Sequence, residues 1–130
     1  SRLTNIEIPE YIIPNIIDEI PILSVAGVFA RGKFVVRNAK ELRVKESDRI
    51  KSMCHNFKIM GLHVTEFEDG FEVDGNIVGT DFTFESFGDH RIAMAFAVMS
   101  MLLPNGGSVN GFEAVGISNP SFIKQLNKII

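Results

Sequence analysis

The hydrophobic pattern is clearest in residues 47–60, where apolar side chains recur every three or four positions: Ile50, Met53, Cys54, Phe57 and Met60. This spacing predicts a helix with one buried face. Ser47 can cap its first turn, and Gly61 can end it. The start of this predicted helix coincides with a dense group of charged residues.

Two other stretches, residues 22–30 and 92–103, are apolar nearly all round. Such helices are expected to be buried on most sides. Asp18 opens the first, which ends at Gly32, and Asp89 opens the second, which ends near Gly106. The prolines at positions 9, 14 and 21 exclude one regular helix through residues 9–21, because proline lacks the N–H that a helix interior needs.

Short alternating runs predict strands at residues 3–8, 33–37, 62–67, 71–73, 77–78, 82–84 and 108–111. Residues 68–70, Glu-Asp-Gly, predict a hairpin between two of them. A last helix is expected from Pro120, with its apolar face formed by Phe122, Ile123, Leu126, Ile129 and Ile130. The order of elements repeats with a period of about half the chain. We therefore expect an α/β (α+β) fold of about two repeated units over residues 1–130, with helices inside and sheets outside.

Composition restricts the classes of function. The chain has 130 residues, enough for one domain, and its 13 Lys+Arg against 16 Asp+Glu give a formal charge of −3. This balance argues against nucleic acid as a partner. The single Cys54 fits a cytoplasmic location. No signal peptide is visible, no apolar run approaches the ~20 residues of a membrane span, and no membrane partner is expected. Because the chain begins at Ser1, we expect a piece of a longer protein.

One charged group, Lys45, Glu46 and Arg49, has the composition of an anion site. Residues three or four apart share a helix face, and a helix N-terminus favours anions. Two cations beside a carboxylate fit a phosphate or carboxylate ligand with an acid or base next to it. The alternative is a simple Glu46–Arg49 pair, which contributes only a few tenths of a kcal/mol.

A second charged group, Asp89-His90-Arg91, precedes the apolar helix of residues 92–103. Arg91 offers a fork for carboxylate or phosphate, and His90 a titratable donor. Asp89 can instead be an ordinary N-cap with two exposed neighbours. Asp18 likewise is either part of an acidic first turn or a general base whose pKa is raised beside a buried helix.

Metal, nucleophile and nucleotide sites are not indicated. His55, His63 and His90 do not fall at ligand spacing, and Cys54 is placed in the core by its helical spacing. The glycines form no phosphate-binding loop of the P-loop or dinucleotide type. We expect no metal and no cofactor.

Three blocks of sequence resemble the EPSP synthase (3-phosphoshikimate 1-carboxyvinyltransferase) family: residues 18–21 (DEIP), 42–49 (LRVKESDR) and 89–95 (DHRIAMA). Their order and spacing match, and residues 119–122 (NPSF) are similar to the start of the family's last helix. The resemblance covers nearly the whole chain but only the C-terminal part of that enzyme, so the N-terminal domain is expected to be absent. It implies the enolpyruvyl transferase fold, an inside-out α/β barrel of βαβαββ-type units.

The resemblance also implies a reaction. The 5-hydroxyl of shikimate 3-phosphate adds to C2 of phosphoenolpyruvate, and phosphate then leaves to give 5-enolpyruvylshikimate 3-phosphate, a step of the shikimate pathway. The sister family, UDP-N-acetylglucosamine enolpyruvyltransferase, has Asp-Leu-Arg at residues 89–91 and lacks the Lys-Glu-Ser-Asp-Arg block. The comparison favours shikimate 3-phosphate as the substrate.

By resemblance, the catalytic residues are Asp18, as the base on the substrate hydroxyl, and Glu46, as the proton shuttle at the methylene carbon. Lys45 would bind near the same hydroxyl, Arg49 and Arg91 would clamp the phosphoenolpyruvate carboxylate, and His90 would lie beside the clamp. Asp48 and Asp89 would orient the arginines.

Two positions depart from some family members, Ile117 where they have a phosphate-binding Lys and Glu41 where they have an Asn. The expected missing portion implies that the chain alone is inactive. The alternative from another class is a non-catalytic anion-binding or interaction module.

Overall fold

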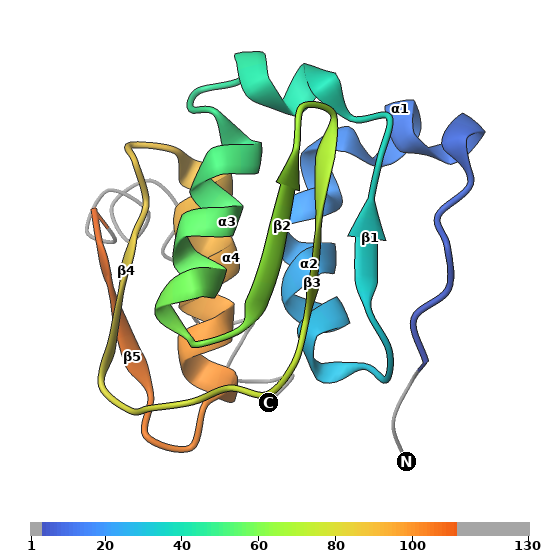
Figure 1. Cartoon of the computed structure of the whole chain (residues 1–130). Coiled ribbons are helices and arrows are strands. Elements are labelled where there is room, and N and C mark those ends of the chain that lie inside the picture. Colours follow the sequence, from blue (N-terminus) through green and yellow to red (C-terminus); the bar gives the residue numbers. More distant parts are fainter. Residues whose placement is uncertain (1–3, 112–130) are drawn as a thin grey trace.

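Three long helices lie against two small sheets in the computed structural model, which describes residues 4–111 (Figure 1). The helical elements are η1 (Glu10–Ile12), α1 (Ile13–Ile16), η2 (Ile17–Glu19), α2 (Ile20–Phe29), η3 (Lys40–Val44), α3 (Arg49–Ile59) and α4 (His90–Leu102), where η marks a 3-10 helix. The strands are β1 (Phe34–Val36), β2 (His63–Phe67), β3 (Gly70–Asp74), β4 (Phe82–Glu85) and β5 (Gly107–Asn110). This mixture agrees with the predicted α/β class.

The first sheet is antiparallel, with strand order β1-β3-β2, and the second is the parallel pair β4-β5. Figure 1 shows α2 behind the three-stranded sheet, and α3 and α4 between that sheet and the β4-β5 pair. Helix α2 packs against α4, and α4 also contacts β4 and β5. Helix α4 therefore lies in the interior, as the sequence predicted, whereas α2 is only about half buried, with Ile22 and Leu23 exposed. The number of repeats stays a prediction.

The hairpin between β2 and β3 depends on a close backbone approach. Phe67 pairs with Gly70 across the turn that the sequence predicted. A Cβ atom at Gly70 would lie 1.8 Å from the carbonyl oxygen of Val36, closer than any non-bonded contact allows. Glycine at this position lets β1 lie against the start of β3, which places the hairpin tip beside η3.

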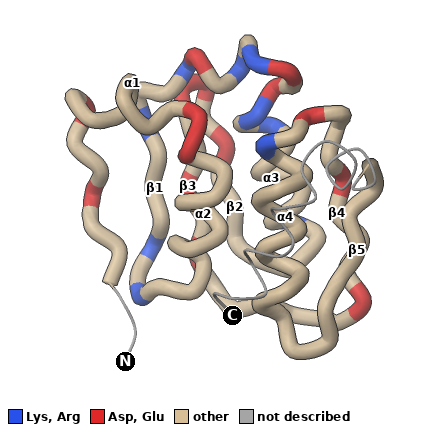
Figure 2. Tube along the Cα trace, turned by 180° about the vertical axis from the view of Figure 1, so that it is seen from behind, with Lys and Arg blue, Asp and Glu red and all other residues tan. Residues whose placement is uncertain are grey.

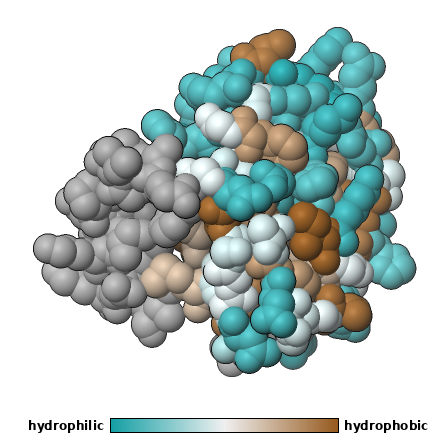
Figure 3. Space-filling view, turned by 90° about the vertical axis from the view of Figure 1, so that its left-hand side faces the viewer, coloured by the Kyte–Doolittle hydropathy of each residue, from teal (hydrophilic) through white to brown (hydrophobic). Residues whose placement is uncertain are grey.

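The core between the layers is aromatic. The ring of Phe96 in α4 lies 5.5 Å from that of Phe57 in α3 and 4.9 Å from that of Phe84 in β4, measured between centroids. All three side chains are fully buried, and such pairs add about 0.5–1.5 kcal/mol each beyond the burial of their area. This cluster fixes α3 and α4 side by side, so their N-terminal ends lie together. On the face seen in Figure 3, hydrophobic side chains form small groups separated by hydrophilic ones.

Helix α3 begins one residue later than the sequence suggested. Its N-cap is Asp48, whose Oδ1 accepts a hydrogen bond of 3.0 Å from the amide of Lys51. Ser47 donates elsewhere, so the prediction that it caps the helix is wrong. The end near Gly61 is confirmed, since this residue follows the last turn with a φ of +80°.

Two predicted strands are absent from the described residues. Within 4–8, only Thr4 forms an isolated bridge, to Arg31, and Ile6 is 81% exposed. Residues 77 and 78 are not a strand either, although the amide of Val78 donates to the carbonyl oxygen of Met60. Both runs have the alternation of a strand, but no neighbouring strand pairs along their length. The predicted helix after Pro120 lies outside the described residues.

The prolines divide the N-terminal helical region as predicted, into η1, α1, η2 and α2. Taken together, Glu10–Phe29 are 20 helical residues, within which an 18-residue window has a mean hydropathy of 1.6, so the stretch is long and apolar enough to cross a membrane. The expectation that no run approaches this length is therefore wrong. One such helix is weak evidence, because the core helix of a soluble protein meets the same criteria. Here the segment includes Asp18 and packs against α4 through α2.

Candidate functional site

Arg49 is the centre of the charged site. It is the first residue of α3, and its side chain is only 3% exposed. Its Nε lies 2.9 Å from Asp89 Oδ2, its Nη1 lies 3.0 Å from Asp18 Oδ1, and its Nη2 donates to Glu46 Oε2. A buried guanidinium needs such partners, because burial of an unpaired charge is strongly unfavourable. Arg49 thus joins three segments that are far apart in sequence.

Asp89 holds Arg49 from the N-terminus of α4. Its Oδ1 accepts from the amides of Arg91 at 2.9 Å and Ile92 at 3.4 Å, which caps the helix. Its Oδ2 accepts from Arg49 and, at 2.8 Å, from the hydroxyl of Ser47. Burial raises the pKa of this carboxyl, but the hydrogen bonds from Arg49 and Ser47 outweigh it and hold the pKa below its ordinary value. Asp89 is therefore both the predicted N-cap and the predicted partner of an arginine.

Asp18 faces the same arginine from η2. Besides Arg49, its Oδ1 has Lys45 Nζ at 3.5 Å, and its backbone oxygen accepts from Arg91 Nη1 at 3.3 Å. Burial raises the pKa of Asp18, but the hydrogen bond from Arg49 and the charges of Lys45, Arg49 and Arg91 together lower it. Of the two alternatives for Asp18, the one with a raised pKa is not supported, because three cations surround a carboxylate that remains 44% exposed.

Lys45 and Glu46 reach the site from an irregular segment. We expected them to share a helix face with Arg49, but α3 begins at Arg49 and the backbone of Lys45 is extended, with φ −94° and ψ −158°. Both side chains nevertheless meet Arg49 or its partner Asp18. The Glu46–Arg49 ion pair expected from spacing alone is present, and it forms part of the larger cluster.

The cluster surrounds an open hollow of about 340 Å³. Its lining consists of Asp18, Lys45, Glu46, Arg49, Gly88, His90 and Arg91. All six residues predicted to be catalytic or substrate-binding are in this list. Figure 2 shows charged residues gathered at the end of the molecule where α3 begins.

The hollow combines fixed and free groups. Arg49 is buried and fixed by carboxylates, whereas His90 and Arg91 in the first turn of α4 are exposed. Glu46 is 65% exposed at the rim. Arg49 and Arg91 together can bind an anionic ligand. Glu46, an exposed carboxylate beside them, can transfer a proton to or from that ligand.

Asp48 has a different partner from the one expected. Its Oδ1 caps α3, and its Oδ2 accepts a hydrogen bond of 2.9 Å from Arg43. Asp48 contacts neither Arg49 nor Arg91 through its carboxylate in the hydrogen bonds and ion pairs of residues 4–111. Asp48 therefore contacts Arg43, whereas Asp89 contacts Arg49, and the expectation that both orient the site arginines stays a prediction.

Sequence reasoning missed two contributors. The hydroxyl of Ser47 bonds to Asp89, so this residue is part of the support of Arg49 rather than a helix cap. Gly88 lines the hollow with a φ of +70°, in the left-handed region where glycine is favoured. The sequence signal that could have identified Gly88 is its position directly before Asp89, the N-cap of α4.

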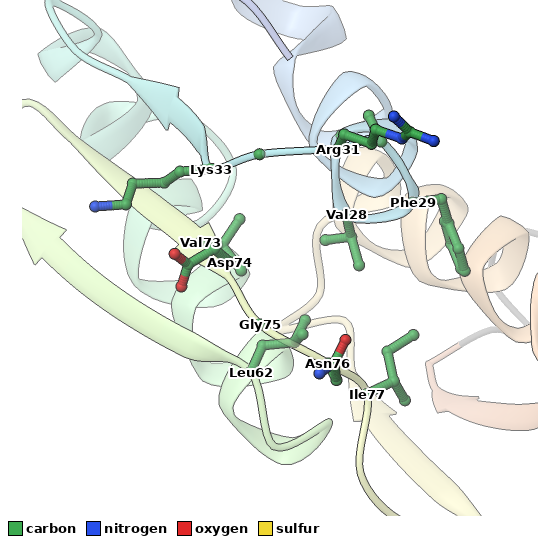
Figure 4. Close-up of a pocket in the computed structure, with 13 residues that line it drawn as sticks. Val28, Phe29, Arg31, Lys33, Leu62, Val73, Asp74, Gly75, Asn76 and Ile77 are labelled. Carbon is green, nitrogen blue, oxygen red and sulfur yellow. The ribbon is translucent and has the colours of Figure 1, made fainter. Parts of the chain in front are cut away.

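A larger hollow, of about 630 Å³, lies between the end of α2, the start of β1 and the turn after β3 (Figure 4). Its lining includes none of the predicted residues. Figure 4 shows the charged ends of Arg31 and Lys33 pointing away from each other at opposite sides of the view. These groups do not converge on one ligand, so size alone does not make this hollow a candidate site.

Within residues 4–111, no group of three or more His, Cys, Asp and Glu side chains could hold a metal ion. The carboxylates of Asp18, Glu46 and Asp89 all bind Arg49, so the guanidinium occupies the position between them where a metal ion would have to bind.

Comparison with known proteins identifies the family. The sequence profile of EPSP synthase (3-phosphoshikimate 1-carboxyvinyltransferase) matches residues 2–126. The chain belongs to the EPSP synthase family. This confirms the resemblance carried by the three sequence blocks.

Among EPSP synthase relatives, the chain is 41% identical over 129 residues to the 3-phosphoshikimate 1-carboxyvinyltransferase of Thermotoga sp. (strain RQ2), covering 99% of this chain and 31% of the relative. It is 44% identical over 129 residues to that of Geobacter metallireducens, covering 99% and 30%. The chain therefore spans about a third of the length of these relatives.

A solved structure of EPSP synthase from Acinetobacter baumannii has the same arrangement, with a TM-score of 0.87 and 38% identity over 98% of this chain and 30% of that chain. The predicted enolpyruvyl transferase fold is thus confirmed. Of the two family departures, Glu41 lies in η3 with Oε1 3.9 Å from Lys45 Nζ, and Ile117 lies outside the described residues.

Proposed function

We propose that this chain forms one wall of the active site of a 3-phosphoshikimate 1-carboxyvinyltransferase. The reaction transfers the enolpyruvyl group of phosphoenolpyruvate to the 5-hydroxyl of shikimate 3-phosphate and releases phosphate. The observation that carries the proposal is the convergence of Asp18, Lys45, Glu46, Arg49, His90 and Arg91 on one hollow. The relatives' names supply the reaction, and the hollow supplies groups suited to it.

The two arginines act as the clamp for the phosphoenolpyruvate carboxylate. Arg91 is exposed and makes one side-chain hydrogen bond, to the backbone oxygen of Asp18, so it can turn toward a ligand. Arg49 is held by Asp89 on its buried side and by Glu46 on its exposed side. A ligand carboxylate can replace Glu46 on Arg49 without disturbing Asp89. Fixed cations then stabilise the ligand's charge without a metal.

Replacement by the ligand frees Glu46 for proton transfer. Addition delivers a proton to the methylene carbon of phosphoenolpyruvate, and elimination removes one from the same carbon, so a single carboxyl can serve both steps. Glu46 is suited to this because it lies at the rim on an irregular segment and pairs with the same cation that binds the ligand.

Asp18 acts as the acceptor of the hydroxyl proton, with Lys45 beside the same hydroxyl. The surrounding cations keep the pKa of Asp18 below the ordinary value, so this carboxylate is ionised but a weak base. A bound anion shares the charges of Arg49 and Arg91, which reduces their effect on Asp18. The basicity of Asp18 therefore rises when the ligand is present. His90 lies beside Arg91 and assists the clamp.

The test uses the complete product of the gene that encodes this chain, assayed for phosphate release that requires both phosphoenolpyruvate and shikimate 3-phosphate. Glu46→Gln keeps the shape of the side chain but removes the titratable group, so we expect a loss of about a hundredfold or more in kcat. Glu68→Gln is the matched control, since this carboxylate is 78% exposed and pairs with Lys40 away from the hollow.

An unchanged kcat in Glu46→Gln would refute the shuttle. Binding of both ligands without any phosphate release by the unaltered protein would favour the non-catalytic anion-binding module instead. We also propose a cytoplasmic location, supported by the free thiol of Cys54. The other partner that we propose is the rest of the enzyme, which corresponds to the part of the relatives' sequences that this chain does not match.

A further inference from the structure

Arg43 lies outside the hollow, yet it makes more polar contacts than most residues that line it. Its Nε donates to the carbonyl oxygen of Glu68 at 3.0 Å, and its Nη2 to that of Phe67 at 2.7 Å. Its Nη1 lies 2.9 Å from Asp48 Oδ2 and 2.9 Å from Glu66 Oε2. All three nitrogens of the guanidinium are engaged, and the side chain is 22% exposed.

These contacts close a short loop. Arg43 directly precedes residues 44–47, and Asp48 directly follows them, so the Arg43–Asp48 ion pair ties the two ends of this segment together. Val44 ends η3, and residues 45–47, which include Lys45 and Glu46, belong to no helix or strand. Asp48 also caps α3, so the same contact fixes the segment relative to Arg49.

The anchor for Arg43 is the β2–β3 hairpin. The two carbonyl groups belong to Phe67, the last residue of β2, and Glu68 in the turn. The partner strand β3 is the central strand of its sheet, so the hairpin tip is held by a ladder on both sides. The guanidinium of Arg43 is planar and holds its donors in fixed positions relative to one another. It therefore fixes residues 44–47 relative to the hairpin more precisely than the flexible ammonium group of a lysine would.

We propose that Arg43 is a positioning residue, which couples the hairpin tip to residues 44–47 and so directs Lys45 and Glu46 into the hollow. The consequence for catalysis rests on the proposed function, whereas the ordering of the segment does not. Alignment of catalytic groups is sensitive to small displacements, since a shift of about 1 Å can cost about a hundredfold in rate.

Arg37 offers a matched control at the other side of the same hairpin tip. Its Nε lies 2.8 Å from Asp69 Oδ1, and its guanidinium lies 4.1 Å from the centroid of the Phe67 ring. It therefore also binds the hairpin through an arginine, but its hydrogen bonds and ion pairs in residues 4–111 do not reach Asp48. Arg37→Ala removes a hairpin contact while leaving the ends of residues 44–47 tied.

The first experiment measures backbone order parameters from 15N relaxation by NMR in the 130-residue chain. In Arg43→Ala, we expect the order parameters of residues 45–47 to fall from about 0.85 to below about 0.6, because the two ends of the segment are no longer tied. Arg43→Lys should give an intermediate decrease, and Arg37→Ala none. Amides in the middle of α4 serve as the internal reference for intact folding.

The second experiment measures steady-state kinetics in the complete gene product. Arg43→Ala should lower kcat by about tenfold to a hundredfold with a smaller change in KM for either substrate, because alignment rather than binding is lost. Arg43→Lys should recover part of kcat, and Arg37→Ala should retain it.

The two readouts separate the possible failures. Unchanged order parameters in residues 45–47 of Arg43→Ala would overturn the positioning role, whatever the activity. Lower order parameters with unchanged kcat would overturn its link to catalysis. If the unaltered gene product transfers no enolpyruvyl group, the proposed function fails, and lower order parameters still support the ordering of residues 44–47 by Arg43.

Discussion

Arg49 and Asp89 form a buried ion pair between the first residue of α3 and the N-cap of α4. Their side chains are 3% and 0% exposed, and the contact from Nε to Oδ2 is 2.9 Å. The pair links two helices whose starts carry the charged groups that the sequence singled out. Asp18 and Glu46 also contact Arg49, so the pair lies at the centre of the hollow.

The first prediction concerns the stability of this pair. Asp89→Ala leaves a buried guanidinium with fewer partners and removes a helix cap, so we expect a loss of about 3–5 kcal/mol in the free energy of unfolding. Urea denaturation of the 130-residue chain measures it. The control is Glu72→Ala, which removes the exposed pair with Lys33 and should cost at most about 1 kcal/mol. Equal losses in the two variants would contradict the importance of the buried pair.

The second prediction is a pH dependence. The pKa of Asp89 lies below its ordinary value of 3.8 in the folded chain, since hydrogen bonds from Arg49 and Ser47 outweigh the effect of burial. The folded state therefore gains stability from this group above the unfolded pKa, and loses it as the pH falls through the folded pKa. Unfolding free energies from about pH 5 down to about pH 2 should fall less steeply in Asp89→Asn than in the unaltered chain. Parallel curves would contradict this assignment.

The third prediction concerns Cys54. Burial raises the pKa of this thiol to about 12, so almost no thiolate exists at neutral pH. A thiol reagent such as 5,5′-dithiobis(2-nitrobenzoate) should react with the folded chain only as fast as the chain opens, and rapidly in denaturant. Fast reaction under native conditions would show that α3 does not shield this side chain as described.

The fourth prediction concerns the 130-residue chain by itself. It holds one group of site residues and spans about a third of the length of its relatives. We expect no detectable phosphate release from phosphoenolpyruvate and shikimate 3-phosphate, and a Kd for shikimate 3-phosphate of about 1 mM or weaker, near −4 kcal/mol. Titration followed by NMR should shift the amides around Arg49. Measurable turnover by this chain would refute the prediction.

The sequence predicted α3 from apolar spacing over three turns, and α4 from a long apolar run with Asp89 at its start. The residues of the hollow were predicted because the family resemblance added tertiary information to charge patterns that local spacing left open. Residues 3–8 failed for the opposite reason. Their alternation resembles a strand, but a strand also needs a partner along its length, and local sequence does not encode one.

The differences within the site have a common cause. Asp48 and Asp89 both precede a helix, and both cap it, yet only Asp89 meets Arg49. Which aspartate receives the buried arginine depends on how α3 packs against α4. The role of Arg43 was missed similarly, because two of its partners are backbone carbonyl groups, which every residue possesses.

The side chains of the hollow are nearly balanced in charge. Lys45 and Arg49 pair with the carboxylates of Asp18, Glu46 and Asp89, whereas Arg91 bonds to the backbone oxygen of Asp18. On Arg49, an arriving anion therefore exchanges one carboxylate for another, rather than neutralising bare positive charge. Such an exchange attracts and releases few counterions, so ligand affinity should depend only weakly on ionic strength.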